Sequence, residues 1–339
     1  MSQGESNYIE GAATAAGAAQ AALALAADDW RHFLAEQRWY TAKAALPAGI
    51  RVAHAIPLPW GDGAFAIAIV DVALENRVDR YQIAVAQRPS APAELPPRAV
   101  IHRSSASAPG VLYDAVFDAD FRAGLGVALA SGAVAHDGRG AAWTIEHAGG
   151  ATNLASSPPS RVASGEQSNT SLIFDDAVIL KLFRIVKPGI QPDVEVTEFL
   201  TTHTAFANTP PLLAIITLEE SESGERATAG MAQRFLPGAV DAWRYALDQG
   251  RAQFAAPPDR ELANAFTADA RRLGALTRAM HEALASAVDH DPDVAAFLPE
   301  AATPEDAERW AERARRSVRD ALQLLAAAIA RGDFPKEHA

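Results

Sequence analysis

Apolar residues in the first part of the chain follow the close spacing that is typical of β-strands. Residues 64–74 and 79–88 are two such runs, separated by a short polar turn. Ahead of them, residues 28–37 show helical spacing and begin with two aspartates that can cap a helix. The pattern therefore predicts a sheet with a helix packed on it, followed by a further helix over residues 117–131.

A second hairpin is predicted in the middle of the chain. Residues 171–174 and 177–183 are β-prone runs, and Asp175 and Asp176 between them form a short turn of residues that tolerate unusual backbone angles. The strands of this hairpin carry most of the candidate chemistry.

The loop ahead of this hairpin, residues 165–171, is small and rich in hydroxyl groups. Such a loop can bring backbone N–H groups and hydroxyls against phosphate oxygens, where bulky residues would be held away. Taken alone, a Ser/Thr loop is more often a solvated turn. The candidate phosphate-contacting residues are Ser168, Asn169, Thr170 and Ser171.

Lys181 interrupts the apolar second strand of the hairpin. Alternation places it on the same face as Ile179 and Phe183, so its charge needs a counter-ion. Glu195 is the natural candidate, in the first turn of a helix that Pro192 begins. A strand lysine is often only an edge charge, and an acid in a first turn also complements the helix dipole. The order of loop, hairpin, lysine and helical glutamate nevertheless matches the protein-kinase arrangement.

Two further β-prone runs, residues 212–218 and 227–235, extend the predicted sheet. In a kinase-like fold the chain then becomes a hinge whose backbone N–H and C=O groups meet the adenine edge. Residues 233–236 are the candidate hinge, with Gln233 and Phe235 as candidate contacts. The aromatic side chain of Phe235 equally fits a core position.

Two long amphipathic helices are predicted near the end of the chain, and we expect them to pack on each other. The second opens at residues 303–306 with a sequence similar to a capping box. The first helix places Leu262, Phe266, Leu273, Leu276, Met280 and Leu284 on one face. We expect the second helix to bury Trp310, Val318, Leu322, Leu325 and Ile329.

Taken together, these motifs resemble the maltokinase family, trehalose-synthase-associated sugar kinases that share the protein-kinase-like and aminoglycoside-phosphotransferase-like fold. The matching segments are residues 165–171, 180–184, 188–189 and 192–195, the cap-domain signature Arg38-Trp39-Tyr40 with Lys43, and the helix from Leu273-Gly274 through Thr277 to His281–Leu284. The likeness spans most of the chain. It implies transfer of the ATP γ-phosphate to the anomeric hydroxyl of maltose, which gives maltose 1-phosphate.

The resemblance is incomplete toward the end of the chain. The family's His-Gly-Asp catalytic loop and its Asp-Phe-Glu metal motif do not occur in these 339 residues. The His-Asp and Asp-Phe pairs that do occur lack the residues that should follow them, and they fit ordinary turns. We therefore assign no catalytic and no metal-binding residue, and we expect the Mg²⁺ ligands on a missing part of the C-lobe.

The expected fold class is α+β. It comprises an N-terminal cap domain, a protein-kinase-like N-lobe with an antiparallel sheet and one helix, and a partial helical C-lobe. The expected bounds are a flexible lead-in at residues 1–25, the cap domain at 26–155, the N-lobe at 156–240 and the incomplete C-lobe at 241–339.

Composition and charge narrow the function classes without changing this outline. A net charge of −12 argues against nucleic-acid binding, which needs clustered Lys and Arg. No run approaches the roughly 20 strongly apolar residues of a membrane span. No Lys or Arg precedes Arg31 to make the positive start of a signal peptide. The absence of cysteine is consistent with a reducing cytoplasm.

Three functions remain open. The first is the ATP-binding portion of a maltokinase-like sugar kinase of glycogen, α-glucan and trehalose metabolism, inactive alone and active with a complementary C-lobe. The second is a non-catalytic ATP-binding or scaffolding partner of a trehalose synthase or an intact kinase. The third is another small-molecule phosphotransferase of the same fold. The expected ligands are ATP with Mg²⁺ and, where the C-lobe is supplied, maltose or a related sugar.

Overall fold

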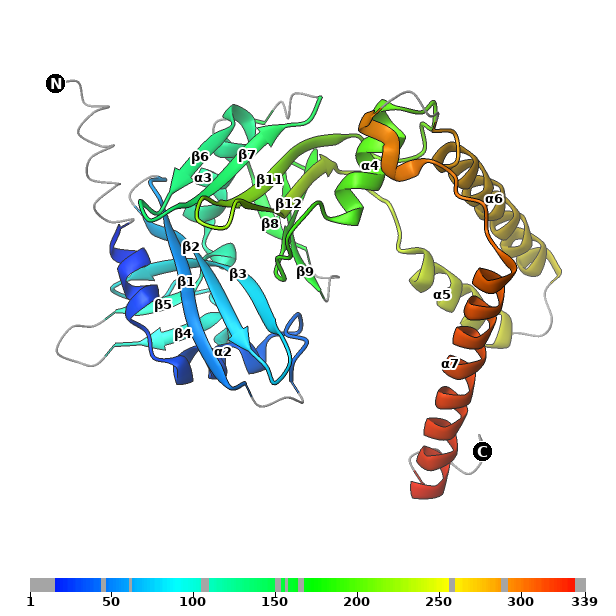
Figure 1. Ribbon diagram of the computed structural model, residues 1–339, viewed down its shortest axis with the longest axis horizontal. Coiled ribbons are helices and arrows are strands. Elements are labelled where there is room, and N and C mark those ends of the chain that lie inside the picture. The colour runs from blue at the N-terminus through cyan, green and yellow to red at the C-terminus, as the bar shows by residue number, and fades with distance from the viewer. Residues whose placement is uncertain are drawn as a thin grey trace. The chain divides into compact units, whose positions relative to one another are not determined.

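The computed structural model describes residues 16–43, 47–60, 63–104, 110–149, 154–155, 158–163, 168–255, 260–287 and 292–332. The chain divides into two compact units, Met1–Leu284 and Ala285–Ala339, and each is described by itself. Two antiparallel sheets form the larger part of the first unit (Figure 1). The α+β class predicted from the sequence is confirmed.

The first sheet has five strands in the order β1-β2-β3-β5-β4. The strands are β1 (Gly49–Leu58), β2 (Ala64–Ala73), β3 (Val78–Arg88), β4 (Val100–Arg103) and β5 (Val111–Asp114). The short helix η1 (Pro97–Ala99) precedes β4, and η2 (Ala115–Phe117) follows β5. The predicted hairpin of the two β-rich runs is confirmed, because β2 and β3 pair along their whole length.

Helix α2 packs on this first sheet. It spans Ala27–Glu36 and buries Trp30, Phe33 and Leu34, as its pattern predicts. Its start differs from the prediction, since Ala26 is the N-cap residue and Asp28 and Asp29 lie inside the first turn. There the two carboxylates complement the helix dipole instead of capping backbone N–H groups.

The flexible lead-in predicted at residues 1–25 is wrong for the part that the structure describes. Residues 16–24 form a helix, and Ala18, Ala19 and Ala22 are buried in the same core as α2. Alanine favours helices, and its small side chain lets the helix approach its neighbours closely. Residues 1–15 lie outside the described residues.

The second sheet has seven strands in the order β6-β7-β11-β12-β10-β9-β8. The strands are β6 (Ala133–His136), β7 (Ala141–His147), β8 (Ser160–Val162), β9 (Asn169–Phe174), β10 (Val178–Phe183), β11 (Leu212–Glu220) and β12 (Glu225–Arg234). Helix α4 (Pro192–Thr202) lies on one face, where Val194 packs with Phe183 and Met231. The antiparallel sheet with one helix predicted for the N-lobe is confirmed.

Helix α3 (Ala119–Ser131) confirms the helix predicted at residues 117–131 and lies between the two sheets. Gly124 and Gly126 allow this close packing, because a Cβ on either would lie 2.6 Å from the side chain of Trp60 or Pro158. The buried face of α3 joins residues of both sheets in one hydrophobic core and comprises Phe121, Leu125, Ala128 and Leu129.

Hydrogen bonds join the two sheets at the strand that carries Lys181. The Gln82 N–H of β3 donates to the Arg184 carbonyl, one residue beyond β10, at 2.9 Å. The buried Gln82 side chain donates to the Ala229 carbonyl at 2.9 Å and accepts from Trp143 Nε1 at 2.7 Å. Because Ala229 and Trp143 belong to the second sheet, Gln82 ties the first sheet to three segments of the second.

The predicted domain boundary near residue 155 stays a prediction. Strands β6 and β7, which precede it, pair with each other and continue through β11 into the second sheet. The first sheet and its helices end before them. Part of the segment that we assigned to the cap domain therefore completes the sheet of the kinase-like lobe.

Helices form the rest of the chain. They are α5 (Ala242–Ala255) and α6 (Arg260–Leu284) in the first unit, and η3 (Pro292–Phe297) and α7 (Pro304–Arg331) in the second. The capping box predicted at residues 303–306 is confirmed, with Thr303 and Asp306 bonded reciprocally. Among the described residues, no helix combines the length and the apolar character that crossing a membrane requires.

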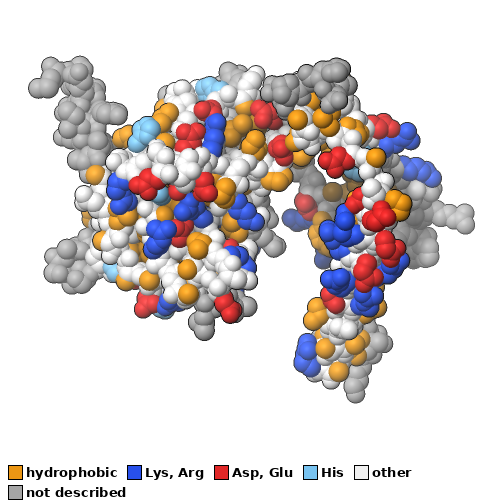
Figure 2. Space-filling view, viewed as in Figure 1, with side chains coloured by type: hydrophobic (Ala, Val, Ile, Leu, Met, Phe, Trp, Pro, Cys, Tyr) orange, Lys and Arg blue, Asp and Glu red, His pale blue; other side chains and the backbone are white. Residues whose placement is uncertain are grey.

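The burial predicted for the apolar face of α7 is wrong. Its residues Trp310, Val318, Leu322, Leu325 and Ile329 are 42 to 59% exposed, and hydrophobic side chains are visible on the surface of this helix (Figure 2). The helical period predicts which residues share a face, but not that another surface covers them. The predicted packing of the two long helices on each other stays a prediction.

Candidate functional site

The candidate site is built on the hairpin of β9 and β10. The two aspartates of its turn, Asp175 and Asp176, have φ values of 52° and 47°, in the left-handed region that tight hairpin turns require. The turn predicted at the two aspartates is confirmed, but it also contains Ala177, because Phe174 pairs with Val178 and the second strand begins one residue later than predicted. The turn sets a register in which Lys181 lies directly opposite Ser171.

Lys181 shares one face of the sheet with polar and apolar neighbours that suit a ligand. Its partners across the ladder are Ser171 on β9 and Met231 on β12, so the three side chains lie on the same side. Met231 packs with Val194 of α4, which places that helix on this side too. The Ser171 hydroxyl is buried and has no hydrogen-bond partner within the described residues. An ammonium group beside an unpartnered hydroxyl fits phosphate oxygens as acceptors.

The carboxylate that pairs with Lys181 in this structure is Asp193. The Lys181 Nζ lies 3.6 Å from Asp193 Oδ2, and the two side chains are 27% and 49% exposed. Asp193 and Glu195 both stand in the first turn of α4, which Gln191 caps. The predicted counter-ion is thus corrected from Glu195 to Asp193, because the earlier residue of that turn reaches the lysine. A role for Glu195 in placing Lys181 during the reaction stays a prediction.

Thr170 does not face the same way as Lys181. It pairs with Leu182, whose side chain lies on the opposite face of the sheet. Its hydroxyl accepts a hydrogen bond from Arg184 Nε at 2.7 Å. The prediction that this hydroxyl contacts phosphate is therefore wrong for this structure, because alternation along β9 directs Thr170 toward the cap domain.

The remaining loop candidates lie at the start of β9. Ser168 is exposed just ahead of the strand, and Asn169 is its first residue. Their contacts with phosphate stay predictions. Residues 165–167 of the same loop lie outside the described residues.

The protein's own hydrogen bonds occupy part of the candidate hinge. The Phe235 N–H donates to the Ala177 carbonyl at 2.7 Å, and the Gln233 side-chain amide donates to the Pro210 carbonyl at 3.3 Å. The Arg161 guanidinium lies 5.6 Å from the centre of the Phe235 ring. An adenine contact through the Phe235 N–H would require its present hydrogen bond to break. The binding roles of Gln233 and Phe235 stay predictions.

Sequence reasoning missed the most deeply buried ion pair of this region, between Arg184 and Asp114. The two side chains are 2% and 1% exposed and lie 2.6 Å apart, and they connect the end of β10 to the end of β5. The Arg184 guanidinium also lies 5.0 Å from the centre of the Trp39 ring. Burial raises the pKa of the Asp114 carboxyl, and the charge of Arg184 opposes that shift. Trp39 and Arg184 both belong to recognisable motifs, but no spacing pairs either with Asp114.

The residues around Lys181 do not by themselves form a magnesium site. Among the described residues, no group of three or more His, Cys, Asp or Glu side chains is placed to hold a metal ion. The one carboxylate paired with Lys181 already neutralises that lysine, whereas Mg²⁺ demands an octahedral set of oxygen ligands. The arrangement fits the phosphates of a nucleotide and leaves the metal to other ligands.

Comparison with solved structures shows which known fold this chain shares. Glucosamine kinase in complex with glucosamine, ADP and inorganic phosphate matches with a TM-score of 0.51 and 20% identity, and its crystal form B matches with a TM-score of 0.53 and the same identity. These matches cover 92% of this chain and 62% of the glucosamine kinase chain, so this chain spans less than two thirds of that protein's length. The likeness shows a kinase-like fold.

The N-terminal domain makes the assignment more specific. Residues 33–118 match the family model of the maltokinase N-terminal cap domain. This range contains the whole five-stranded sheet. It also contains Trp39, whose ring lies 5.0 Å from the Arg184 guanidinium. The chain therefore resembles maltokinases, with residues 33–118 matching their cap domain and joined to a lobe of kinase-like fold.

Proposed function

We propose that this chain is the ATP-binding portion of a maltokinase-like sugar kinase that forms maltose 1-phosphate for α-glucan and trehalose metabolism. The observation that carries the proposal is the face shared by Lys181, Ser171 and helix α4. Bound ATP would supply the phosphoryl group. Lys181 and Ser171 would hold its phosphates, and an acid of α4 would orient the lysine. This proposal implies a cytoplasmic location, where ATP is available.

Catalysis needs groups beyond those on this face. A base that orients the attacking hydroxyl and ligands that hold Mg²⁺ contribute several orders of magnitude in rate. The sequence contains neither the His-Gly-Asp nor the Asp-Phe-Glu motif that supplies them in the family it resembles. We therefore expect the 339-residue chain alone to form no measurable maltose 1-phosphate, and a mixture or fusion with a matching C-lobe to form it. Robust maltose-dependent ATP consumption by the purified chain would contradict this.

Nucleotide binding is the direct test of the proposed site. Calorimetry with Mg-ATP on the full chain should show weak binding that Lys181→Ala reduces by about tenfold or more, because a charge-assisted hydrogen bond to phosphate is lost. Lys187→Ala is a matched control, since Lys187 is an exposed lysine six residues further along. Equal heats from wild type and Lys181→Ala would remove Lys181 from the site.

The two acids of α4 can be separated in the enzyme restored with a C-lobe. If Glu195 places Lys181 in the reacting state, Glu195→Gln lowers turnover more than it weakens ATP binding, and Asp193→Asn leaves turnover near that of wild type. The reverse pattern would assign the positioning role to Asp193, which pairs with Lys181 in this structure.

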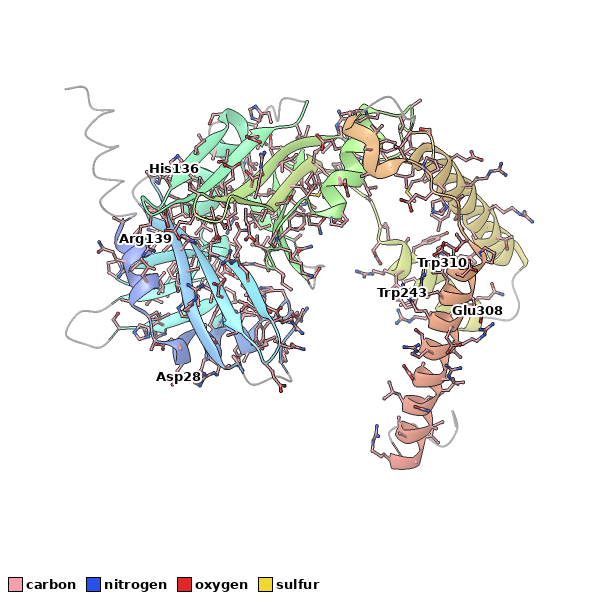
Figure 3. All side chains as sticks on the ribbon, viewed as in Figure 1. Asp28, His136, Arg139, Trp243, Glu308 and Trp310 are labelled. Carbon is pink, nitrogen blue, oxygen red and sulfur yellow. The ribbon has the colours of Figure 1, made fainter. Side chains whose placement is uncertain are left out.

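Exposed aromatic side chains favour a second candidate function. Trp310 on α7 is 54% exposed and Trp243 on α5 is 72% exposed (Figure 3). Such surfaces mark interaction sites, as expected of a non-catalytic ATP-binding or scaffolding partner of a trehalose synthase or an intact kinase. Co-sedimentation of the chain with each purified protein, compared with a Trp310→Ser variant, tests this function.

The structural likeness to glucosamine kinase supports a third candidate, a phosphotransferase that acts on an amine-bearing or other sugar. Parallel assays of the restored enzyme with maltose and with glucosamine distinguish it from a maltokinase. A higher kcat/KM for glucosamine would replace maltose as the substrate while leaving the proposed nucleotide site intact.

A further inference from the structure

A polar cavity of about 270 Å³ lies where the cap domain meets the start of β9. It is lined by the residues just after α2, by η1, η2 and the end of β5 on the cap side, by the start of β9 and by residues at the ends of β8 and β10. Thr170, one of its lining residues, is on the face of the sheet opposite to Lys181. The cavity therefore opens on the face away from Lys181, and the two sites adjoin at Asn169, which also lines the cavity.

Positive charge dominates the lining of this cavity. Arg38, Arg98 and Arg184 contribute three guanidinium groups, and Asp114 is the one acidic side chain among the lining residues that the structure describes. Both oxygens of Asp114 are already engaged, one by Arg184 and the other by the Val116 N–H. Arg38 and Arg98 thus have no ion-pair partner of their own in the described lining, although the charge of Arg98 acts on the Asp114 carboxyl.

The two arginines without an ion-pair partner in the described lining lie on anchored backbone. Arg38 and Arg98 are exposed, and neither has a carboxylate partner among the interactions of the described residues. The buried Gln37 side chain donates to the Arg98 carbonyl at 2.8 Å, which ties η1 to the end of α2. The Arg98 guanidinium lies 5.7 Å from the centre of the Phe117 ring. Arg38 and Arg98 therefore line the same cavity.

Guanidinium groups that line one cavity without carboxylates of their own are suited to phosphate. Arginine remains charged at all physiological pH values and presents a planar fork of donors that matches phosphate oxygens. The third guanidinium, that of Arg184, is held in place by Asp114, Thr170 and Trp39, so its charge is fixed in the cavity wall.

We propose that this cavity binds a small phosphate-bearing anion, with Arg38 and Arg98 as its direct ligands and Arg184 as a buried positive charge behind it. The ligand is either inorganic phosphate or the phosphate group of a sugar phosphate. Binding neutralises positive charge at the junction of the two sheets, so it stabilises the folded chain in proportion to ligand concentration.

Calorimetric titration of the full chain tests the site, with inorganic phosphate and glucose 1-phosphate as separate probes and sodium chloride keeping the ionic strength constant. We expect saturable binding of at least one probe, and affinity weaker by about tenfold or more in Arg38→Gln/Arg98→Gln. Both positions are exposed, so the variant should keep the wild-type circular dichroism spectrum. Tighter binding of glucose 1-phosphate would identify a sugar phosphate as the ligand.

Two controls make the site specific. Arg103→Gln removes an exposed arginine from β4 of the same sheet and should leave affinity unchanged, because Arg103 does not line the cavity. Lys181→Ala should also leave it unchanged, which separates this site from the proposed nucleotide site. The proposal is overturned if neither probe binds saturably, if the double variant binds as wild type does, or if Arg103→Gln or Lys181→Ala weakens binding equally.

Discussion

Helices α3 and α7 have opposite surroundings, and α7, the more amphipathic of the two, is the exposed one. In α3, Phe121 and Leu125 are completely buried between two sheets, whereas Leu322 of α7 is 59% exposed. Helix α3 contains two glycines, which weaken a helix by about 1 kcal/mol each, and relies on packing. Helix α7 instead has a capping box and ion pairs along its own surface, such as Arg319 with Glu312.

The comparison shows that an amphipathic pattern does not by itself make a helix buried. The periodicity of apolar residues decides which side of a helix is available for packing. Burial needs a second surface, which in α3 is supplied by both sheets and held in place by contacts far apart in the sequence. Substitutions in the layer around α3 should therefore cost much more stability than equivalent substitutions in α7.

The largest effect is expected at the ion pair that joins the two sheets beside α3. Asp114→Ala leaves the 2% exposed Arg184 without its carboxylate and should reduce the free energy of unfolding by about 3–5 kcal/mol. Urea unfolding followed by circular dichroism measures the loss. The double variant Asp114→Leu/Arg184→Met should recover most of it, since no unpaired buried charge remains. A loss below about 1 kcal/mol would mean that water reaches Arg184.

A pair of leucine truncations compares the two helices directly. Leu125→Ala in α3 should cost about 2–5 kcal/mol, because it leaves a cavity in the shared core. Leu322→Ala in α7 should change stability by less than about 0.5 kcal/mol, because the side chain is already exposed. The same denaturation assay serves for both. Comparable losses from the two variants would show that α7 is covered in solution.

Acid pH should weaken the start of α3 through Asp118. Burial tends to raise the pKa of this carboxyl, but hydrogen bonds from Arg88 and Tyr113 outweigh that effect, and the pKa lies below its ordinary value of 3.8. A lowered pKa in the folded state gives stability that is present above the unfolded pKa and lost as the pH falls through the folded one. Asp118→Asn should thus cost about 1–3 kcal/mol at neutral pH.

The acid dependence itself is the measurement. Unfolding midpoints recorded as the pH falls below 3.8 should decline more steeply for wild type than for Asp118→Asn, since only the wild type has this carboxylate to protonate. Parallel declines would show that Asp118 titrates alike in the folded and unfolded chain.

The smallest effect concerns the start of α7. Thr303→Ala removes the side chain that accepts from the Asp306 N–H and should cost about 1 kcal/mol of local helix stability. Amide exchange in the first turn of α7 should then be about fivefold faster, with little change in global unfolding. Thr277→Ala in the middle of α6 is the control. Unchanged exchange after Thr303→Ala would mean that the cap does not hold this turn.

Local patterns in the sequence predicted several elements of this fold but missed β1, β5 and α5. The turn at Asp175 and Asp176, the strands beside it and the helix before residue 132 all follow from the spacing of apolar and turn residues within a short window. Alternation alone could not assign Thr170 and Lys181 to opposite faces, because that depends on the register. The turn includes Ala177 and so pairs Phe174 with Val178 and Ser171, not Thr170, with Lys181.

Contacts between distant segments could not be predicted in this way. Arg184 and Asp114 are 70 positions apart, and no periodicity relates a strand end in one sheet to a strand end in another. The choice of Asp193 over Glu195 as the partner of Lys181 depends on the rotation of α4 against the sheet. Packing of Val194 sets that rotation, and single-sequence patterns do not encode it.

The link between the chain just after β10 and strand β3 bears on how such a protein is inherited. Modules that evolution shuffles are joined by loose linkers that few contacts cross. Here Ile185 bridges to Tyr81, and the Arg184 carbonyl accepts from Gln82, so the segment leading from Lys181 to α4 is pinned to the cap. A chimera that exchanges the cap alone would remove the residues with which this segment pairs. We expect recombination to transmit the cap and the kinase-like lobe together as one unit.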